Sequence, residues 1–156
     1  MFVHCLITFL VAMVPIVELR GAIPIGVGLG VPTAAAYVLA VIGNMIPVPF
    51  IYFFARKILR WGKDKRIIGK FCRFCLKKGA KGGKKLQAKA KGGVFLALFA
   101  FVAIPIPGTG AWTGTLAASI LKLDFKKSII AVILGVLVAG IIMGMISAGI
   151  FGLIRG

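Results

Sequence analysis

Acidic side chains are nearly absent from this sequence. Glu18, Asp64 and Asp124 are the only three acids among 156 residues, against 20 lysines and arginines, and the chain has one histidine and three cysteines. So few groups do not supply the paired carboxylates or ligand clusters on which hydrolytic and metal centres are built. We therefore expect no enzyme activity, no cofactor and no metal.

Polar residues are scarce as well. The sequence is 60% hydrophobic, 21 residues are glycine, and the mean hydropathy is +1.07. A chain of this composition cannot cover a soluble core of its own size, so it predicts an all-α integral membrane protein. The N-terminal segment lacks the basic start and small-residue cleavage pattern of a secretory signal, so we keep it in the fold. We expect residues 1–156 to form a single membrane domain.

Most of the positive charge lies in one stretch. Fifteen of the 20 basic residues fall between Arg56 and Lys91, with Asp64 as the one acid there. The positive-inside bias makes this stretch cytoplasmic. Its first part has apolar residues at helical spacing, which predicts an amphipathic helix on anionic lipid headgroups. These apolar residues are Ile67, Ile68, Phe71, Phe74 and Cys75. Nucleic acid is not an expected partner, because a recognition fold and a set of stacking aromatics are missing.

The apolar sequence on either side of the basic stretch has the same order in each half. A segment broken by proline comes first, and a segment long enough to cross a hydrocarbon core of about 30 Å follows. Residues 1–55 form repeat one, residues 56–93 the basic linker and residues 94–156 repeat two. Pro47 and Pro49 should kink the spanning segment of repeat one.

Each broken segment predicts two helical arms of about 10 to 13 residues, too short to cross the membrane alone. Proline removes a backbone donor and disfavours helix at the preceding residue, so the arms should end near the prolines. A re-entrant hairpin is the expected result in each half. The expected arms are Phe2–Val14 with Gly21–Gly30 and Val94–Ile104 with Gly110–Leu121, and the spanning segments are Thr33–Ala55 and Ser128–Leu153.

Lysines after the second hairpin distinguish re-entry from four full crossings. Full crossing of residues 94–121 would put Lys122, Lys126 and Lys127 on the side opposite the basic linker, against the positive-inside bias. Re-entry keeps them cytoplasmic. The connection Gly30–Thr33 has no basic residue, as an external link should. The prediction is an inverted repeat with both termini outside and a site at mid-membrane.

Small residues recur at every fourth position in three segments. In lipid this spacing lets helix backbones approach closely, so we expect packing seams, either within one chain or between two chains of a homodimer. The seams are Ala22, Gly26, Gly30 and Ala34, then Gly110, Gly114 and Ala118, then Gly140, Gly144, Ala148 and Gly152.

Glu18 and Arg20 stand two residues apart in an apolar stretch. Ionisable groups in membrane segments mostly face a polar cavity, pair together or handle a substrate. Arg20 is always charged, and its planar fork suits a phosphate or a carboxylate. Desolvation favours the protonated form of Glu18, and a nearby Arg20 favours the ionised form. Whether Glu18 couples transport to protons depends on which influence is larger. The alternative is a pair that neutralises itself or anchors the topology.

The run from Pro15 to Pro24, with Glu-Leu-Arg-Gly-Ala at its centre, resembles the small multi-drug export family. Ile42-Gly43-Asn44 and the run from Ile104 to Gly114 extend the resemblance over nearly the whole chain. The resemblance implies an exporter.

Each half is also distantly similar to the DedA-type membrane proteins. Pro15 and Glu18 match the pattern of a first hairpin, and Pro107-Gly108 that of a second. The arginine that this pattern expects after Pro-Gly is replaced by Thr109 and Gly110, and Arg20 would supply the cation from the other hairpin. This similarity implies movement of polyprenyl phosphates or phospholipids, often linked to the proton gradient.

We expect a transporter of an anionic lipid phosphate or a small organic anion, located in a prokaryotic cell membrane. Helix N-termini at Gly21 and Gly110 would aim N–H groups at the anion. A proton-coupled exporter of lipophilic cations, with a cation–π face from Trp112, and a passive lipid scramblase are the alternatives. The expected substrate-binding residues are Glu18, Arg20, Gly21, Asn44, Pro107, Gly108, Thr109, Gly110 and Thr113.

Overall fold

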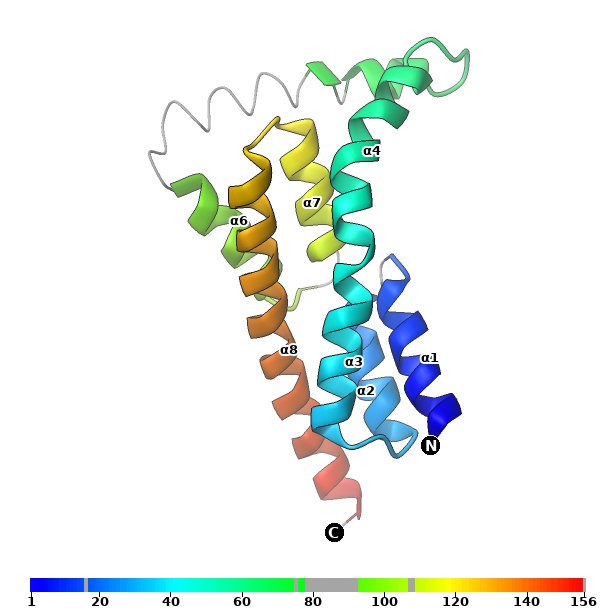
Figure 1. The fold of residues 1–156 in the computed structure, drawn as a ribbon, viewed down its shortest axis with the longest axis vertical. Helices are drawn as coiled ribbons and strands as arrows, with labels where there is room; N and C mark the ends of the chain where they lie inside the picture. The colour runs from blue at the N-terminus through cyan, green and yellow to red at the C-terminus, as the bar shows by residue number, and fades with distance from the viewer. Residues whose placement is uncertain (16, 75, 78–92, 107–108, 156) are drawn as a thin grey trace.

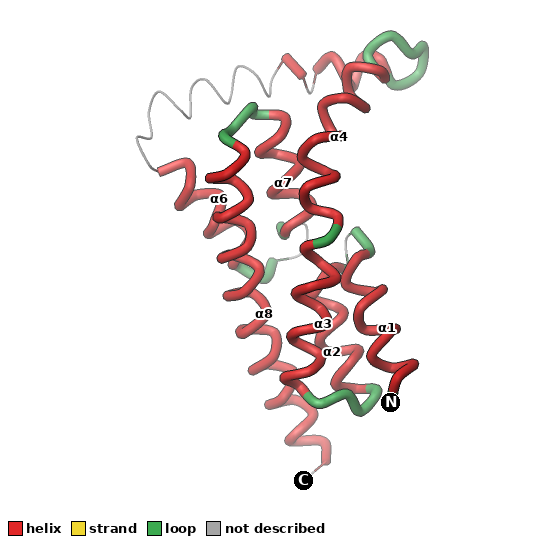
Figure 2. Tube along the Cα trace, in the orientation of Figure 1, coloured by secondary structure: helices red, strands yellow, loops and turns green. Residues whose placement is uncertain are grey.

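Helices make up every regular element in the part of the chain that the structure describes. The structure is a computed structural model, and it describes residues 1–15, 17–74, 76–77, 93–106 and 109–155. The all-helical prediction is confirmed (Figures 1 and 2). The helices are α1 (Phe2–Met13), α2 (Glu18–Gly28), α3 (Thr33–Met45), α4 (Pro47–Gly62), α6 (Gly93–Ala103), α7 (Ala111–Ile120) and α8 (Phe125–Arg155).

Two helical rods are long and apolar enough to cross a membrane. The first is Thr33–Gly62, in which α4 continues α3, and the second is Phe125–Ile154. Each has 30 residues, with mean hydropathies of 2.0 and 3.0. At about 1.5 Å per residue each rod exceeds a hydrocarbon core of about 30 Å. Helix α3 ends and α4 begins on either side of Ile46, whose backbone angles stay helical (φ −57°, ψ −49°). Pro47 follows as the first residue of α4 and has no backbone donor. The kink expected at Pro47 and Pro49 stays a prediction.

Helices α1, α2, α6 and α7 are too short to cross. They have 12, 11, 11 and 10 residues, so they reach only about 15 to 18 Å. Figure 1 shows α1 and α2 as one antiparallel pair and α6 and α7 as another, with the pairs at opposite ends of the molecule and their turns near mid-height. Both chain ends lie at one end of the molecule, and residues 63–74 lie at the other.

Helix boundaries differ from the predictions at two informative places. Helix α2 begins at Glu18 and not at Gly21, so the N–H of Gly21 donates to the Val17 carbonyl inside the helix at 3.0 Å. The helix N-terminus predicted at Gly21 was wrong, because the turn containing Pro15 is short. Helix α8 begins three residues before Ser128, because the Asp124 carboxylate accepts the N–H of Lys127 and caps it.

Small residues pack the helices as predicted at several seam positions. A Cβ at Gly26 would lie 2.6 Å from Thr8 Oγ1, one at Gly114 would lie 2.7 Å from Val102, and one at Gly140 would lie within 3 Å of the Tyr37 ring. Gly152 is different, because a Cβ there would meet nothing within 4 Å. The packing prediction is confirmed at the first three positions and wrong within this chain at the fourth.

The helices α2 and α7 end in the same backbone motif. After α2 the N–H of Val31 donates to the Gly26 carbonyl, and Gly30 has a φ of +88°. After α7 the N–H of Leu123 donates to the Ala118 carbonyl, and Lys122 has a φ of +57°. In each case a 5→2 bond accompanies the 6→1 bond, which defines a Schellman motif. A long helix follows both motifs.

The amphipathic prediction for the start of the basic stretch holds in part. Residues 69–74 and 76–77 are helical. Ile67, Phe71 and Phe74 are exposed by 94%, 67% and 59%, whereas Cys72 is buried. Cys75 and the glycine-rich residues 79–85 lie outside the described residues.

Candidate functional site

The Glu18 side chain binds the N-terminus of α7. Its Oε1 accepts the N–H of Trp112 at 2.9 Å, and its Oε2 accepts the N–H of Ala111 at 3.3 Å. Only 4% of Glu18 is exposed. The first N–H groups of a helix have no partner within the helix and carry the positive end of its dipole. The carboxylate of the first short pair therefore caps a helix of the second pair.

The Arg20 side chain binds the C-terminal end of α6, the other helix of the second short pair. Its Nη1 donates to the Ile106 carbonyl at 2.7 Å, and its Nη2 donates to the carbonyls of Ile104 and Val102 at 3.0 and 3.1 Å. These carbonyls lie at the C-terminal end of α6 and just beyond it, where carbonyls lack helical donors and the dipole is negative. Arg20 caps α6 as Glu18 caps α7.

The two charges therefore hold two helix ends, one each. Each charge meets a helix end of opposite sign, and the five hydrogen bonds join residues that are 82 to 94 positions apart. The anion at the α7 N-terminus is Glu18, so the N–H groups that were predicted to attract a substrate anion are already occupied. Binding of a substrate anion at Gly110 stays a prediction, which the contacts of Ala111 and Trp112 with Glu18 do not favour.

Backbone conformations around the cap are unusual. Glu18 has a φ of +50°, which is rare for a side chain of its size. Gly110 has a φ of +157° with a ψ of −170°, a region open essentially to glycine alone. A Cβ at Gly110 would also overlap the Glu18 carboxylate. The contact between the two short pairs thus requires glycine at this position.

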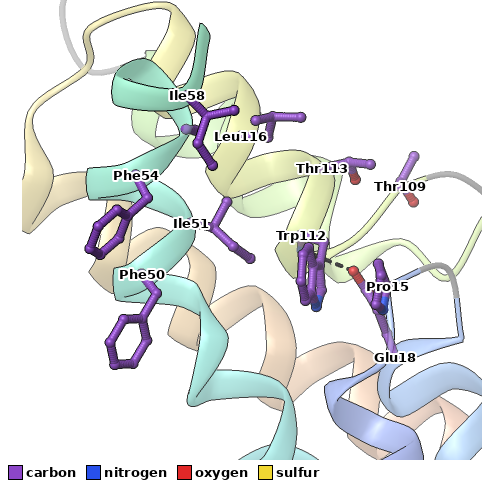
Figure 3. Close-up of a pocket in the computed structure, with 11 residues that line it drawn as sticks. Pro15, Glu18, Phe50, Ile51, Phe54, Ile58, Thr109, Trp112, Thr113 and Leu116 are labelled. Carbon is purple, nitrogen blue, oxygen red and sulfur yellow. Dashed lines mark hydrogen bonds between the residues drawn. The ribbon is translucent and has the colours of Figure 1, made fainter. Parts of the chain in front are cut away.

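A pocket of about 560 Å³ lies between α4, α7 and the turn of the first short pair (Figure 3). Most of its wall is apolar, and its polar groups are Glu18, Thr109 and Thr113. Figure 3 shows Ile51 pointing toward Trp112 across the pocket, with Glu18 at one end. The lining residues are Pro15, Glu18, Phe50, Ile51, Phe54, Ala55, Ile58, Thr109, Trp112, Thr113 and Leu116.

The structure brings together only some of the predicted site residues. Glu18, Thr109 and Thr113 line the pocket, and Gly110 lies against the Glu18 carboxylate. Arg20, Gly21 and Asn44 are not among the lining residues. Pro107 and Gly108 lie outside the described residues.

Asn44 is a buried polar residue without a described partner. It is fully buried in α3, and neither its Nδ2 nor its Oδ1 has a hydrogen-bond partner among the described atoms. The neighbouring Gly43 packs against the Phe9 backbone, where a Cβ would lie 2.5 Å from the carbonyl oxygen. Asn44 is thus buried in the packed interior and is not among the residues that line the pocket.

Sequence reasoning missed the wall that α4 contributes. Phe50, Phe54 and Ile58 recur at every fourth position, and Ile51 and Ala55 at the same spacing, so a helical stripe was the available signal. The contact of α4 with α7 was missed too. Ser119 Oγ donates to the Tyr52 carbonyl at 2.6 Å, and the Tyr52 hydroxyl donates to the Leu123 carbonyl. Polar bonds of this kind hold helices together in lipid.

Two apolar rods of spanning length indicate a helical membrane protein. The family described as "Putative small multi-drug export protein" matches residues 18–142, and the chain belongs to this family. Comparisons with curated proteins and with solved structures gave no match. The similarity to DedA-type proteins stays a prediction.

Proposed function

We propose that this protein exports lipophilic organic cations, which bind in the pocket beside Glu18 and exchange there with a proton. The composition of the pocket is the main support for this proposal. Its walls are apolar and aromatic, with two threonine hydroxyls and one acid, and no lysine or arginine is among the lining residues. A drug-sized molecule fits a pocket of about 560 Å³, since small-molecule sites range from about 300 to 1,000 Å³.

The walls suit a cation that is mostly hydrocarbon. Phe50, Phe54 and Trp112 offer ring faces that attract an organic cation. Phe50 and Phe54 are exposed by 60% and 49%, so the pocket opens on the flank of α4 and not only at the ends of the molecule. A lipophilic substrate could then enter from the hydrocarbon layer. Glu18 supplies the one negative charge of the wall.

Glu18 can couple binding to the arrangement of the two short pairs. The ionised carboxylate accepts an N–H at each oxygen, whereas a protonated carboxyl uses one oxygen as a donor. Protonation therefore weakens the cap on α7. A bound cation interacts with the ionised form only, so proton and cation compete for one group. Such a difference in affinity between two states is what a coupled transporter needs.

The expected anionic substrate receives less support from these contacts. An anion site would need the Arg20 guanidinium to face the pocket, but its Nη atoms donate to three carbonyls at the end of α6. Binding of a lipid phosphate in this pocket stays a prediction, as does the scramblase alternative. The family description, which names export of drugs, agrees better with the cationic reading.

A pair of ions of matched shape tests the charge preference. The protein has two tryptophans, so Trp61→Phe leaves Trp112 as the reporter of the pocket. We expect tetraphenylphosphonium to quench Trp112 fluorescence at lower concentration than tetraphenylborate does. Glu18→Gln should remove that preference. Tighter binding of the borate, lost in Arg20→Gln, would overturn the proposal in favour of an anion site.

The proposed membrane arrangement is a pair of re-entrant hairpins in an inverted repeat. It is supported by the shortness of the paired helices, by their entry from opposite ends and by the shared Schellman motif before each long helix. Residues 63–74 of the basic stretch lie at the end opposite both termini, which agrees with a cytoplasmic location for them.

Thiol labelling tests this topology. On a background without Cys5, Cys72 and Cys75, we introduce one cysteine by Leu29→Cys or Lys126→Cys. In intact cells an impermeant reagent should label the Leu29 site, between α2 and α3, and not the Lys126 site at the start of α8. Labelling of the Lys126 site from outside would support full crossing of the second pair and exclude re-entry.

A further inference from the structure

Four cations line a hollow at the basic end of the molecule. The hollow has a volume of about 280 Å³ and lies where α4 approaches the turn between α7 and α8. None of the six described residues that line it is acidic. They are Arg56, Arg60, Lys63, Leu76, Ile120 and Lys122. Two apolar side chains thus complete a wall that is otherwise positively charged.

Arg56 and Arg60 also line a second hollow beside the first. This one has a volume of about 380 Å³, and Tyr52, Phe53 and Lys57 complete its wall. Phe53 is 60% exposed, and its ring packs 4.8 Å from the ring of Phe125. The two arginines therefore line both hollows, and the second hollow joins three cations to the aromatic side chains of Tyr52 and Phe53. A ligand that touches both needs an anionic group joined to hydrocarbon.

Lys122 occupies a position that usually belongs to glycine. It is the residue after the C-cap of α7, with a φ of +57°, and Gly30 has the same place after α2. A lysine pays steric strain in this region where glycine does not. Strained residues tend to persist where their side chains serve a site. Here the lysine side chain completes the basic wall.

The surroundings resemble an interfacial surface. Ile67 and Phe71 are exposed beside the lysines and arginines of the basic stretch, and Lys65 Nζ lies 4.3 Å from the Trp61 ring centre. Apolar and cationic side chains exposed together fit the boundary of headgroups and acyl chains. Basic pockets between membrane helices on the cytoplasmic side suit anionic headgroups.

We propose that this basic hollow binds the phosphate of an anionic membrane lipid, with the lipid hydrocarbon on the side of Tyr52 and Phe53. The site is separate from the transport pocket and does not depend on the proposed export activity. Arginine supplies forked donors to phosphate oxygens, and lysine supplies a point charge. Arg56, Arg60, Lys63 and Lys122 are the residues assigned to the headgroup.

Lipid exchange on the full-length protein in mixed micelles tests the site. Native mass spectrometry measures how much dioleoylphosphatidylglycerol is retained relative to dioleoylphosphatidylcholine. Each basic residue near an anionic headgroup contributes about a fivefold preference, so Arg56→Gln with Arg60→Gln should lower the preference about thirtyfold. Lys126→Gln with Lys127→Gln is the matched control. It removes the same charge from exposed residues outside the hollow, and the preference should change less than about threefold.

Lys122→Gly separates a lipid ligand from a structural role. Glycine adopts the backbone conformation of Lys122 more easily, so the unfolding temperature should not fall, while phosphatidylglycerol retention should fall about fivefold. Millimolar inorganic phosphate should not displace the lipid. Equal losses in the two double variants would overturn the proposal by showing general surface attraction. Displacement by free phosphate would overturn the lipid as the occupant.

Discussion

The Oε1 atom of Glu18 accepts the backbone N–H of Trp112 at 2.9 Å, joining residues 94 positions apart. The same bond connects the cap of α7 to the pocket beside Glu18, because both residues line that pocket. A change in the charge of Glu18 must therefore change the packing of the two short pairs as well as the pocket.

Glu18→Gln should destabilise the protein and remove the pH dependence of transport. A glutamine amide has one acceptor oxygen, so one of the two N–H groups of α7 loses its partner. We expect a loss of about 1 to 2 kcal/mol in the free energy of unfolding. Thermal unfolding in detergent measures the stability, and uptake into proteoliposomes between pH 6 and about 8 measures the coupling. Retained pH dependence would assign the proton to another group.

Arg20→Lys should keep the positive charge but lose the forked arrangement of donors that reaches the carbonyls. The two Nη atoms of Arg20 reach three carbonyls, whereas a lysine presents a single nitrogen. At least one carbonyl at the end of α6 should lose its donor, which destabilises the protein by about 1 kcal/mol. Arg20→Gln should cost about 2 kcal/mol, because charge is lost too. Equal unfolding temperatures of the two variants would show that charge alone matters.

Gly110→Ala should disrupt the contact between the short pairs. The new Cβ overlaps the Glu18 carboxylate and forces an alanine into a backbone region open to glycine. We expect a loss of about 2 to 3 kcal/mol or failure to fold. Gly149→Ala is the matched control, because a Cβ there meets nothing within 4 Å. In a helix that exchange should stabilise by about 0.5 to 1 kcal/mol. Unfolding temperatures measure both effects, and we expect that of Gly110→Ala to fall and that of Gly149→Ala not to fall.

Local sequence signals predicted the helices well. Hydropathy, proline and the four-residue spacing of small residues are local, and they give the short and long helices of each half to within a few residues at most boundaries. The end of α4 is an exception, because the helix continues seven residues past the predicted Ala55 to Gly62. The basic side chains of Arg56 and Lys57 interrupted the apolar pattern there, although they can lie at a membrane surface on an unbroken helix.

The site was harder to predict because its partners are distant in the sequence. The importance of Glu18 and Arg20 was evident from the sequence, since charges in apolar segments are rare. Their binding partners were not, because backbone N–H and carbonyl groups at helix ends leave no mark in a sequence. A substrate anion was predicted where Glu18 now lies. To predict the pocket wall that α4 forms, one would have to know that α4 packs on α7.

The packing of α8 provides the last prediction. The sequence spacing pointed to Gly144 as a seam position, but the structure places the tighter contact at Gly135. A Cβ at Gly135 would lie 2.7 Å from Val102 Cβ and 3.0 Å from the Phe99 carbonyl oxygen. At Gly144 the nearest atom is Thr33 Cγ2 at 3.7 Å, an ordinary contact.

Gly135→Ala should therefore push α6 away from α8 and destabilise the protein by about 1 to 3 kcal/mol. Gly144→Ala should be neutral or stabilise it by up to about 1 kcal/mol, because alanine favours helix more than glycine does. Thermal unfolding in detergent compares the two. Nothing within this chain opposes a methyl group at Gly144. If Gly144→Ala lowers the unfolding temperature strongly, but the monomer at low concentration stays folded, Gly144 faces a second chain.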